Sequence, residues 1–262
     1  MMKAMTTTKI GPAGEEYRAT LPRALARGID IYDRDQQHVH FAVRCDGRAL
    51  ALAMRIGPSV DPNEMNTLGA LVHTSGQVQF KLPVWLVDAW GLDGYELEWP
   101  DLETLANADA GDVELVGRVV NWEPQIPVDL FRATDGVSHR SAVTIAGQEQ
   151  QSVETSIPTT LADAIGLTDA EARAMITFDC VDGRKVLVVS RNEVERSELR
   201  NSLAVHLAGA QQSQARISAG RVAQELDIYD RLQPGESVPL RWYQQDDEHL
   251  IAFSVKEGSA DA

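Results

Sequence analysis

The chain has 262 residues, of which 44% are apolar, and its charges are scattered, which excludes a disordered or fibrous protein. This length allows one large domain or two smaller ones. No segment approaches the roughly 20 consecutive apolar residues of a membrane span, and the N-terminus lacks the apolar centre of a signal peptide. We therefore expect a cytoplasmic protein without a membrane partner.

The charge balance is strongly acidic. Acidic residues exceed basic ones by 15, and the basic residues comprise 19 Arg but only 5 Lys, a composition typical of a halophilic archaeon. In ordinary salt such a net charge opposes binding to DNA. At about 1 M salt the Debye length is only about 3 Å, so the local placement of arginines decides more than the net charge. DNA is therefore not excluded as a partner.

Four segments repeat one pattern: a short strand, a Pro or Gly-Arg, one to two helical turns and a two-stranded hairpin. Repeats 1 to 4, in chain order, span 15–56, 76–120, 151–190 and 214–256. A flexible N-terminus, a first barrel region, a linker and a second barrel region are expected at 1–14, 15–120, 121–150 and 151–262. Pairing of repeat 1 with 4 and of repeat 2 with 3 is the alternative.

The short helix of each repeat has start and stop signals in the first three copies. A proline stands where the helix begins, and a glycine suited to a left-handed C-cap follows. The pairs are Pro22 with Gly28, Pro83 with Gly91, and Pro158 with Gly166. Repeat 4 departs from the pattern, with Gly220 and Arg221 at the start and Glu225 where glycine is expected.

Alternating apolar residues after each helix predict a hairpin. Asp46-Gly47 and Asp182-Gly183 are signals for a two-residue type I′ turn. The turn of repeat 4 is expected at Gln244–Glu248, and repeat 2 carries an insertion at 100–110. Apolar residues with helical spacing predict a connecting helix over 191–213.

These motifs resemble the AbrB/MazE/SpoVT family of swapped-hairpin DNA-binding proteins. The residues that carry the resemblance are Ile157-Pro158 with Leu161–Leu167, Leu21–Leu25 with Gly28-Ile29, and Leu82-Pro83 with Trp90–Leu92. One repeat is too small to bury its apolar faces alone. The resemblance therefore implies a mostly β protein with short helices, forming two swapped-hairpin β-barrels, each from a pair of internal repeats.

The family binds DNA through basic residues near the first strand and the helix, which implies a non-enzymatic transcriptional regulator. The matching cations here are Arg18, Arg23, Arg27, Lys81, Arg216 and Arg221. Repeat 3 offers only Thr159 and Thr160 at these places. Repeats 1 and 4 could instead combine their five arginines on one face. Arginine contacts phosphates and guanine edges, which is the physical basis of this expectation.

Two alternatives remain open for these side chains. The arginines could pair with nearby carboxylates such as Glu15, Glu16 and Asp30. The chain could then be a protein-interaction or structural scaffold module, antitoxin-like or part of a larger assembly, that uses the same barrels. Tryptophans are enriched in interface hot spots, and the candidates for such a surface, which could equally fill the core, are Trp85, Trp90, Trp99 and Trp122.

Other motifs do not indicate chemistry. His38 and His40 share one strand face but lack a third metal ligand, and neither a phosphate loop nor a nucleophile motif is present. We expect no enzyme, no metal and no cofactor. The sequence "DIYDR" occurs at Asp30–Arg34 and at Asp227–Arg231, and we interpret it as a packing and turn element in which isoleucine enters the core and tyrosine covers the barrel end.

Overall fold

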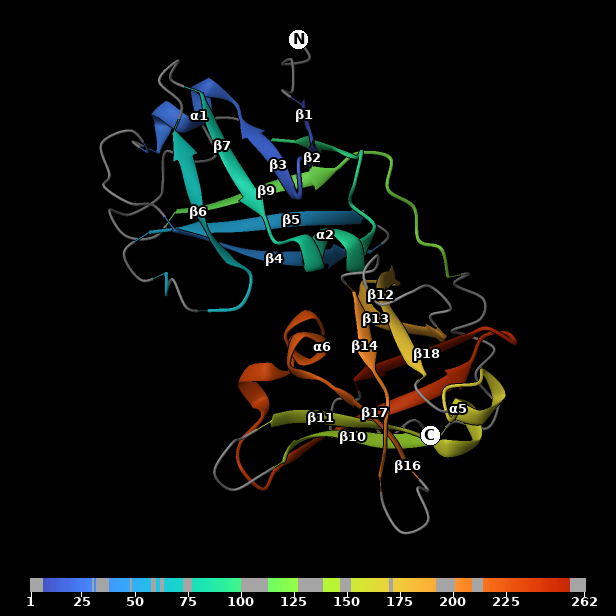
Figure 1. Ribbon diagram of the computed structural model, residues 1–262. Helices are drawn as coiled ribbons and strands as arrows, with labels where there is room; N and C mark the ends of the chain where they lie inside the picture. Colours follow the sequence, from blue (N-terminus) through green and yellow to red (C-terminus); the bar gives the residue numbers. More distant parts are fainter. Residues whose placement is uncertain are drawn as a thin grey trace. The chain divides into compact units, whose positions relative to one another are not determined.

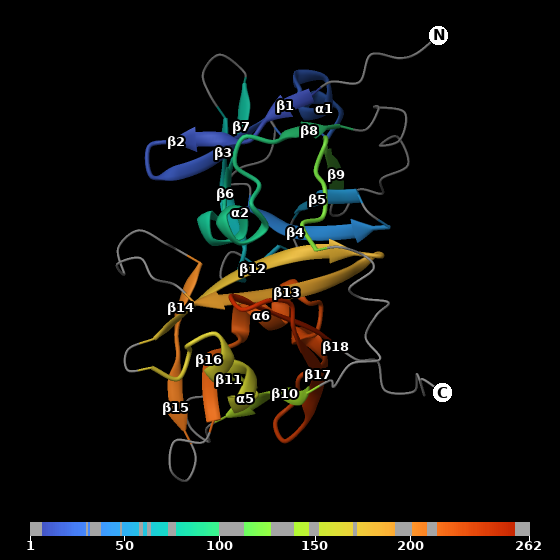
Figure 2. The same cartoon turned by 90° about the vertical axis from the view of Figure 1, so that its right-hand side faces the viewer.

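The computed structural model divides the chain into two compact units, Met1–Glu123 and Pro124–Ala262. The structure describes residues 7–29, 31, 38–47, 49–57, 60–61, 64–72, 77–99, 113–126, 139–146, 152–169, 172–191, 201–208 and 214–254. Each unit contains one nine-stranded antiparallel sheet (Figures 1 and 2). The first sheet forms a half barrel and the second a nearly closed barrel. We call them barrel 1 and barrel 2.

Short strands and single-turn helices make up both barrels. The elements of barrel 1 are β1 (Thr7–Lys9), β2 (Gly11–Ala13), β3 (Glu16–Leu21), α1 (Arg23–Gly28), β4 (His38–Asp46), β5 (Ala49–Ile56), β6 (Thr67–Val72), β7 (Val78–Leu82), α2 (Val84–Trp90), β8 (Glu96–Glu98) and β9 (Val113–Val119). Those of barrel 2 are β10 (His139–Ala146), β11 (Ser152–Ile157), α5 (Thr159–Ala164), β12 (Arg173–Val181), β13 (Arg184–Arg191), β14 (Ser202–Ala204), β15 (His206–Ala208), β16 (Gln214–Ser218), α6 (Gly220–Glu225), η3 (Tyr229–Arg231), β17 (Ser237–Gln244) and β18 (His249–Ser254).

Strand pairing relates the two halves of each barrel by an approximate two-fold symmetry. In barrel 1 the order is β1-β8-β9-β5-β4-β6-β7-β3-β2, and in barrel 2 it is β14-β12-β13-β18-β17-β10-β11-β16-β15. Equivalent strands pair with each other: β3 with β7 and β5 with β9 in barrel 1, β11 with β16 and β13 with β18 in barrel 2. Each hairpin thus inserts beside a strand of the other repeat, so the core is shared.

The two edges of each sheet come from one interrupted strand. In barrel 1 the edge strands β1 and β2 are separated only by Ile10, which is fully buried. In barrel 2 the edge strands β14 and β15 are separated only by Val205. One segment therefore reaches both edges of its sheet, which leaves little backbone open to pairing with other chains.

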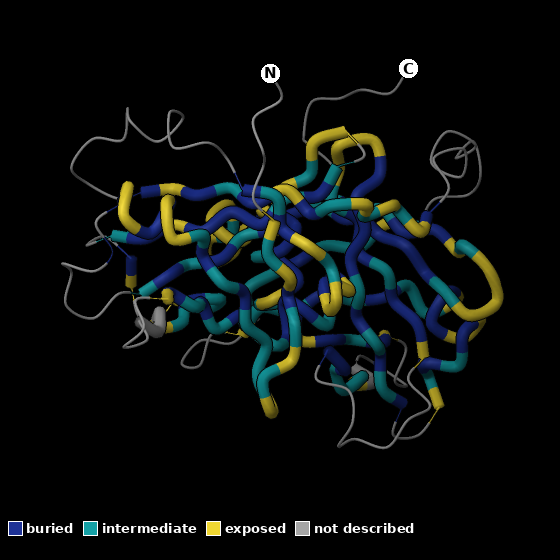
Figure 3. Tube along the Cα trace, turned by 90° about the horizontal axis from the view of Figure 1, so that it is seen from above, coloured by how far each residue is buried: buried dark blue, intermediate teal, exposed yellow. Residues whose placement is uncertain are grey.

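The four α-helices of the described residues bury the same positions relative to their cap residues. The caps are Pro22, Pro83, Pro158 and Ala219. The third, fourth, seventh and ninth residues after the caps are buried: Leu25, Ala26, Ile29 and Ile31; Leu86, Val87, Trp90 and Leu92; Leu161, Ala162, Ile165 and Leu167; Val222, Ala223, Leu226 and Ile228. This spacing places one helix face on the core. Figure 3 shows how buried and exposed stretches alternate along the Cα trace.

The residue eight positions after the cap turns the chain out of the helix. Gly91 has φ 58° and Gly166 has φ 69°, and in repeat 4 the same position is Asp227 with φ 55°. Asp227, rather than Glu225, therefore replaces the expected glycine. Asparagine and aspartate tolerate this left-handed conformation better than other residues with a side chain. Gly28 was also wrong as the closing residue, because it is the last residue of α1.

This geometry explains the isoleucine of both "DIYDR" copies and the first aspartate of the second copy. The isoleucines Ile31 and Ile228 are both 1% exposed and occupy the place of the leucine that follows Gly91 and Gly166. Asp227 also accepts a 2.7 Å hydrogen bond from Nζ of Lys185 on β13. Tyr229 is 44% exposed, so the expectation that it covers the barrel end was wrong. The other residues of the first copy lie outside the described part of the chain.

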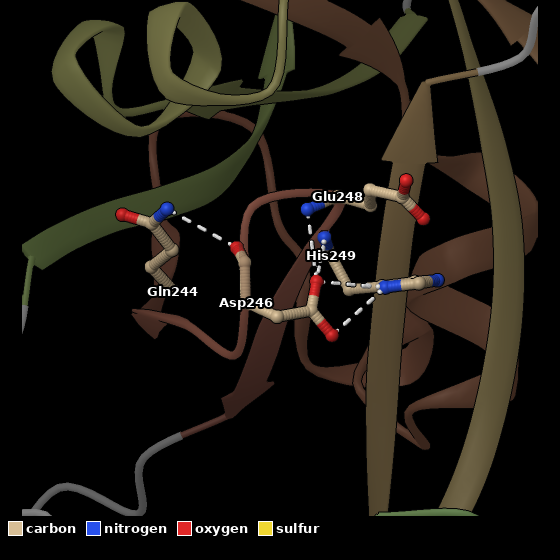
Figure 4. A network of polar contacts seen from close by, with 4 residues as sticks. All are labelled: Gln244, Asp246, Glu248 and His249. Carbon is tan, nitrogen blue, oxygen red and sulfur yellow. Dashed lines mark hydrogen bonds and ion pairs between the residues drawn. The ribbon is translucent and has the colours of Figure 1, made fainter.

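Three hairpin turns were predicted, and two have the expected position. Asp182 and Gly183 have φ 52° and 73°, as a type I′ turn requires. The turn of repeat 4 lies between Gln244 and His249, where Asp246 accepts hydrogen bonds from the backbone of Glu248 and His249 (Figure 4). In repeat 1 the register differs by one residue: Asp46 pairs with Ala49, so the loop begins at Gly47.

Each repeat has one strand more than the sequence indicated. β1 and β2 lie within 1–14, where a flexible N-terminus was expected, and β6 lies between the expected repeats 1 and 2. β10 lies in the expected linker 121–150, and β14 and β15 lie in 191–213, where a helix was expected. β10 pairs with both β11 and β17, so it is an interior strand of barrel 2. The helix prediction failed because β14 and β15 have only three residues each, too few for a recognisable alternation.

Candidate nucleic-acid interface

The strand cations of barrel 1 share one carboxylate. Arg18 on β3 lies directly opposite Lys81 on β7. Nη2 of Arg18 is 3.2 Å from one oxygen of Glu16, and Nζ of Lys81 is 2.7 Å from the other. Hydrogen bonds from Lys81 and Arg18 lower the pKa of Glu16, so this carboxylate stays charged near neutrality. Phosphates would have to compete with Glu16 for both cations.

The strand cation of barrel 2 is also partnered. Nη1 of Arg216 is 3.5 Å from Oε2 of Glu154, and its Nη2 donates a 2.9 Å hydrogen bond to Oε1 of Gln214. Such half-exposed pairs contribute little stability. They do reduce the positive potential that a phosphate would meet.

The helix cations lie on exposed positions of α1 and α6. Arg23 and Arg27 are exposed and lie four residues apart on α1, so they share one helix face. Arg221 is exposed on α6, and partial burial lowers the pKa of its guanidinium without removing the charge at physiological pH. The helices of repeats 2 and 3 contain no cation, so each barrel has one basic helix among those that the structure describes.

The five arginines belong to two different sheets. Arg18, Arg23 and Arg27 lie in barrel 1 with Lys81, whereas Arg216 and Arg221 lie in barrel 2. No strand pair among the described residues joins repeat 1 or 2 to repeat 3 or 4. The strand pairing therefore does not assemble these arginines on one sheet.

The tryptophans of repeat 2 are core residues. Trp85, Trp90 and Trp99 are 5%, 2% and 3% exposed, which corrects the interpretation of these side chains as a protein-interaction surface. The indole of Trp99 donates a 2.6 Å hydrogen bond to Oγ1 of Thr8 on β1. Trp122 is half-buried. β8 of this repeat has three residues, whereas the equivalent strands β4, β12 and β17 have nine, nine and eight.

Sequence reasoning missed a second set of arginines, on the outer face of barrel 1. Arg44, Arg55 and Arg118 project outward from β4, β5 and β9, three strands that are neighbours in the sheet. Arg44 forms an ion pair with Glu114, and Arg55 forms one with Glu64. The alternation of buried and exposed residues could have placed each arginine outside, but the pairing of β5 with β9 joins different repeats and has no local signal.

His40 lies beside these arginines. Its Nδ1 is 3.2 Å from Oγ1 of Thr67 and 3.5 Å from Oε2 of Glu64. Partial burial lowers the pKa of His40, and Glu64 opposes this effect. No group of three or more potential metal ligands occurs among the described residues. His40 is therefore part of a polar cross-strand contact.

Comparisons with protein-family models, curated proteins and solved structures found no match. Within the described residues, no helix has both the length and the apolar character needed to cross a membrane.

Proposed function

We propose that the chain is a non-enzymatic DNA-binding regulator of AbrB type whose phosphate contacts come mainly from Arg23 and Arg27. The observation that carries this proposal is the exposed position of both arginines on one face of α1, directly after β3, which pairs with its equivalent β7 of repeat 2. Arg221 on α6 supplies an equivalent contact in barrel 2. At the strand cations Arg18, Lys81 and Arg216, a phosphate would have to compete with a carboxylate.

Binding through two to four phosphates is modest and depends on salt. Each neutralised phosphate contributes a slope of about 0.9 to the dependence of log affinity on log salt. Specific recognition therefore rests on base contacts by the same arginines and on shape. A halophilic cytoplasm would strengthen this requirement, because screening reduces the electrostatic part of the affinity.

The test is a fluorescence anisotropy titration of labelled duplex DNA at several salt concentrations. We expect the double variant Arg23→Ala, Arg27→Ala to weaken binding about tenfold and to lower the salt slope by about 2. The control variant Arg184→Ala, Arg231→Ala removes the same charge from exposed positions of barrel 2 and should leave the slope unchanged. Equal losses in both variants, or no binding by the unchanged chain, would refute the proposal.

A protein-interaction or scaffold role is the second candidate. It is favoured by the ion pairs that occupy Arg18, Lys81 and Arg216, and by the net charge of −15. Affinity purification from a high-salt lysate, with and without nuclease, separates the two roles. Partners that persist after nuclease treatment support the protein role, and loss of all partners supports DNA.

A further inference from the structure

The outer face of barrel 2 holds an apolar cluster that includes a piece of chain outside the sheet. The cluster consists of Ile126, Val181, Val186, Tyr243, Ile251 and Phe253, with Val188 packed against it. The rings of Tyr243 and Phe253 are stacked, with centroids 5.7 Å apart. Ile126 is 2% exposed although its segment belongs to no helix or strand. A short irregular segment is therefore docked on the face of this sheet.

A buried carboxylate holds the backbone of that segment. Asp179 on β12 is 3% exposed, and its Oδ2 accepts a 2.6 Å hydrogen bond from the N–H of Ile126. Its Oδ1 accepts a 2.7 Å hydrogen bond from the N–H of Cys180. Burial raises the pKa of Asp179, and backbone hydrogen bonds from Ile126, Cys180 and Gln125 oppose the rise. Contacts to the consecutive N–H groups of Gln125 and Ile126 recognise the bent backbone of this segment whatever its side chains.

Barrel 1 forms the same fold without a carboxylate at the position equivalent to Asp179. The last pair before the turn is Asp46 with Ala49 in barrel 1 and Val181 with Arg184 in barrel 2. Counting back from these pairs, Arg44 of β4 matches Asp179. Arg44 is exposed and pairs with Glu114. Burying a carboxylate is unfavourable unless hydrogen bonds compensate. Since the same strand forms with an exposed arginine, Asp179 serves the docked segment rather than the sheet.

We propose that the outer face of barrel 2 is a docking site for a short bent peptide with one aliphatic side chain, and that Pro124–Ile126 is its resident occupant. The aliphatic side chain enters the cluster of valines and aromatic rings, and Asp179 binds the backbone N–H of the same residue. The occupant is tethered, so its effective concentration is on the order of millimolar. A peptide of the same chemistry from another protein must displace it.

Hydrogen exchange of the full chain tests the resident contact. We expect Asp179→Asn to accelerate exchange at the amide of Ile126 about tenfold, because the amide side chain offers one acceptor oxygen where the carboxylate offers two. Strands β12, β13 and β18 should keep their protection. The matched control is Arg44→Gln, at the equivalent position of barrel 1, which should not affect Ile126. Unchanged exchange at Ile126, or a uniform loss of protection across the strands, would overturn the proposal.

A probe peptide tests the docking site itself. The probe is a labelled hexapeptide with the sequence NWEPQI of residues 121–126. We expect it to bind the full chain carrying Ile126→Asp with a Kd on the order of millimolar, not to bind the unchanged chain, and to lose binding when Asp179→Asn is added. If the Ile126→Asp chain keeps its strand protection but binds no probe, or covers the face by self-association, the proposal is wrong.

Discussion

The two barrels share a topology and a set of buried helix positions but present different outer faces. Matching outer positions carry different residues in the two barrels. The pairs, with the residue of barrel 1 first, are Arg44 and Asp179, Asp46 and Val181, Ala51 and Val186, Ala53 and Val188, Arg55 and Ser190, Val116 and Ile251, and Arg118 and Phe253. The inner faces are apolar in both. The inner face and the connections therefore determine the fold, and the outer face is free to acquire separate roles.

The interrupted edge strand also differs in its position between the two barrels. In barrel 1 the break at Ile10 precedes the first repeat, whereas in barrel 2 the break at Val205 precedes the second. Both breaks bring the edges of the sheet together. Either half of the barrel can therefore supply the closing segment.

The largest expected effect tests whether the barrels unfold separately. Trp242 is fully buried, and its indole donates a 2.7 Å hydrogen bond to Oγ of Ser141 on β10. Trp242→Ala should destabilise barrel 2 by about 3–5 kcal/mol. Trp90→Ala should do the same to barrel 1. Hydrogen exchange resolved by segment checks this, and loss of protection in both barrels from either variant would contradict separate unfolding.

A glycine pair at matching positions should give the next largest effect. Gly91→Ala forces an alanine to φ 58°, with nothing within 4 Å of its new Cβ, and should destabilise barrel 1 by about 1 kcal/mol. Gly166→Ala places the Cβ 2.5 Å from Nη1 of Arg191, which is bonded to Asp169. The displaced pair should raise the destabilisation to at most about 2 kcal/mol. Denaturant midpoints measure both, and equal shifts would show that Arg191 moves freely.

Two substitutions of Asp227, which occupies the same left-handed position in repeat 4, should separate the effect of its ion pair from that of its backbone conformation. Asp227→Gly keeps the left-handed turn but loses the ion pair with Lys185, so we expect a change in unfolding free energy below about 1 kcal/mol. Asp227→Ala loses the pair and adds backbone strain, which should increase the effect by about 1 kcal/mol. Chemical denaturation of the two variants side by side measures the difference. If alanine were better tolerated than glycine, the turn would not be decisive.

The smallest expected effect is an opposite response of two carboxylates to pH. The lowered pKa of Glu16 means that its contribution to barrel 1 is present above the ordinary value of 4.5 and is lost as pH falls through the lowered pKa. The raised pKa of Asp179 means that its contribution to barrel 2 is present below 3.8 and is lost as pH rises through the raised pKa. Unfolding midpoints across mildly acidic pH, compared with Glu16→Gln and Asp179→Asn, check the two signs.

The mostly β, two-barrel architecture was predictable because its signals are local. A proline before a short apolar helix, and Asp-Gly between alternating runs, depend only on neighbouring residues. Pro22, Pro83 and Pro158 each occupy the cap of a helix as a result. Repeat 4 lacks the proline, and Ala219 occupies the cap instead, so its sequence offered no marker from which to place the turn at Asp227 rather than at Glu225.

The charged contacts were not predictable because they depend on pairing between repeats. Glu16 meets Lys81 only because β3 and β7 lie side by side in one register. The same holds for Arg216 and Glu154, which lie on neighbouring strands of different repeats. The contact between Asp179 and Ile126 was not predictable because Ile126 lies in a segment expected to be a linker. A carboxylate within an otherwise apolar strand was the one available hint.

Equivalent strands pair within one polypeptide, as β3 pairs with β7. Two separate identical chains would dissociate on dilution, and any substitution would appear in both of them. Here the halves stay together at any concentration, and each can change alone. Repeat 1 thus carries Arg23 and Arg27 where repeat 2 has Val84 and Asp88. Because its two repeats lie in one chain, this barrel is not bound to the sequence identity that a homodimer imposes.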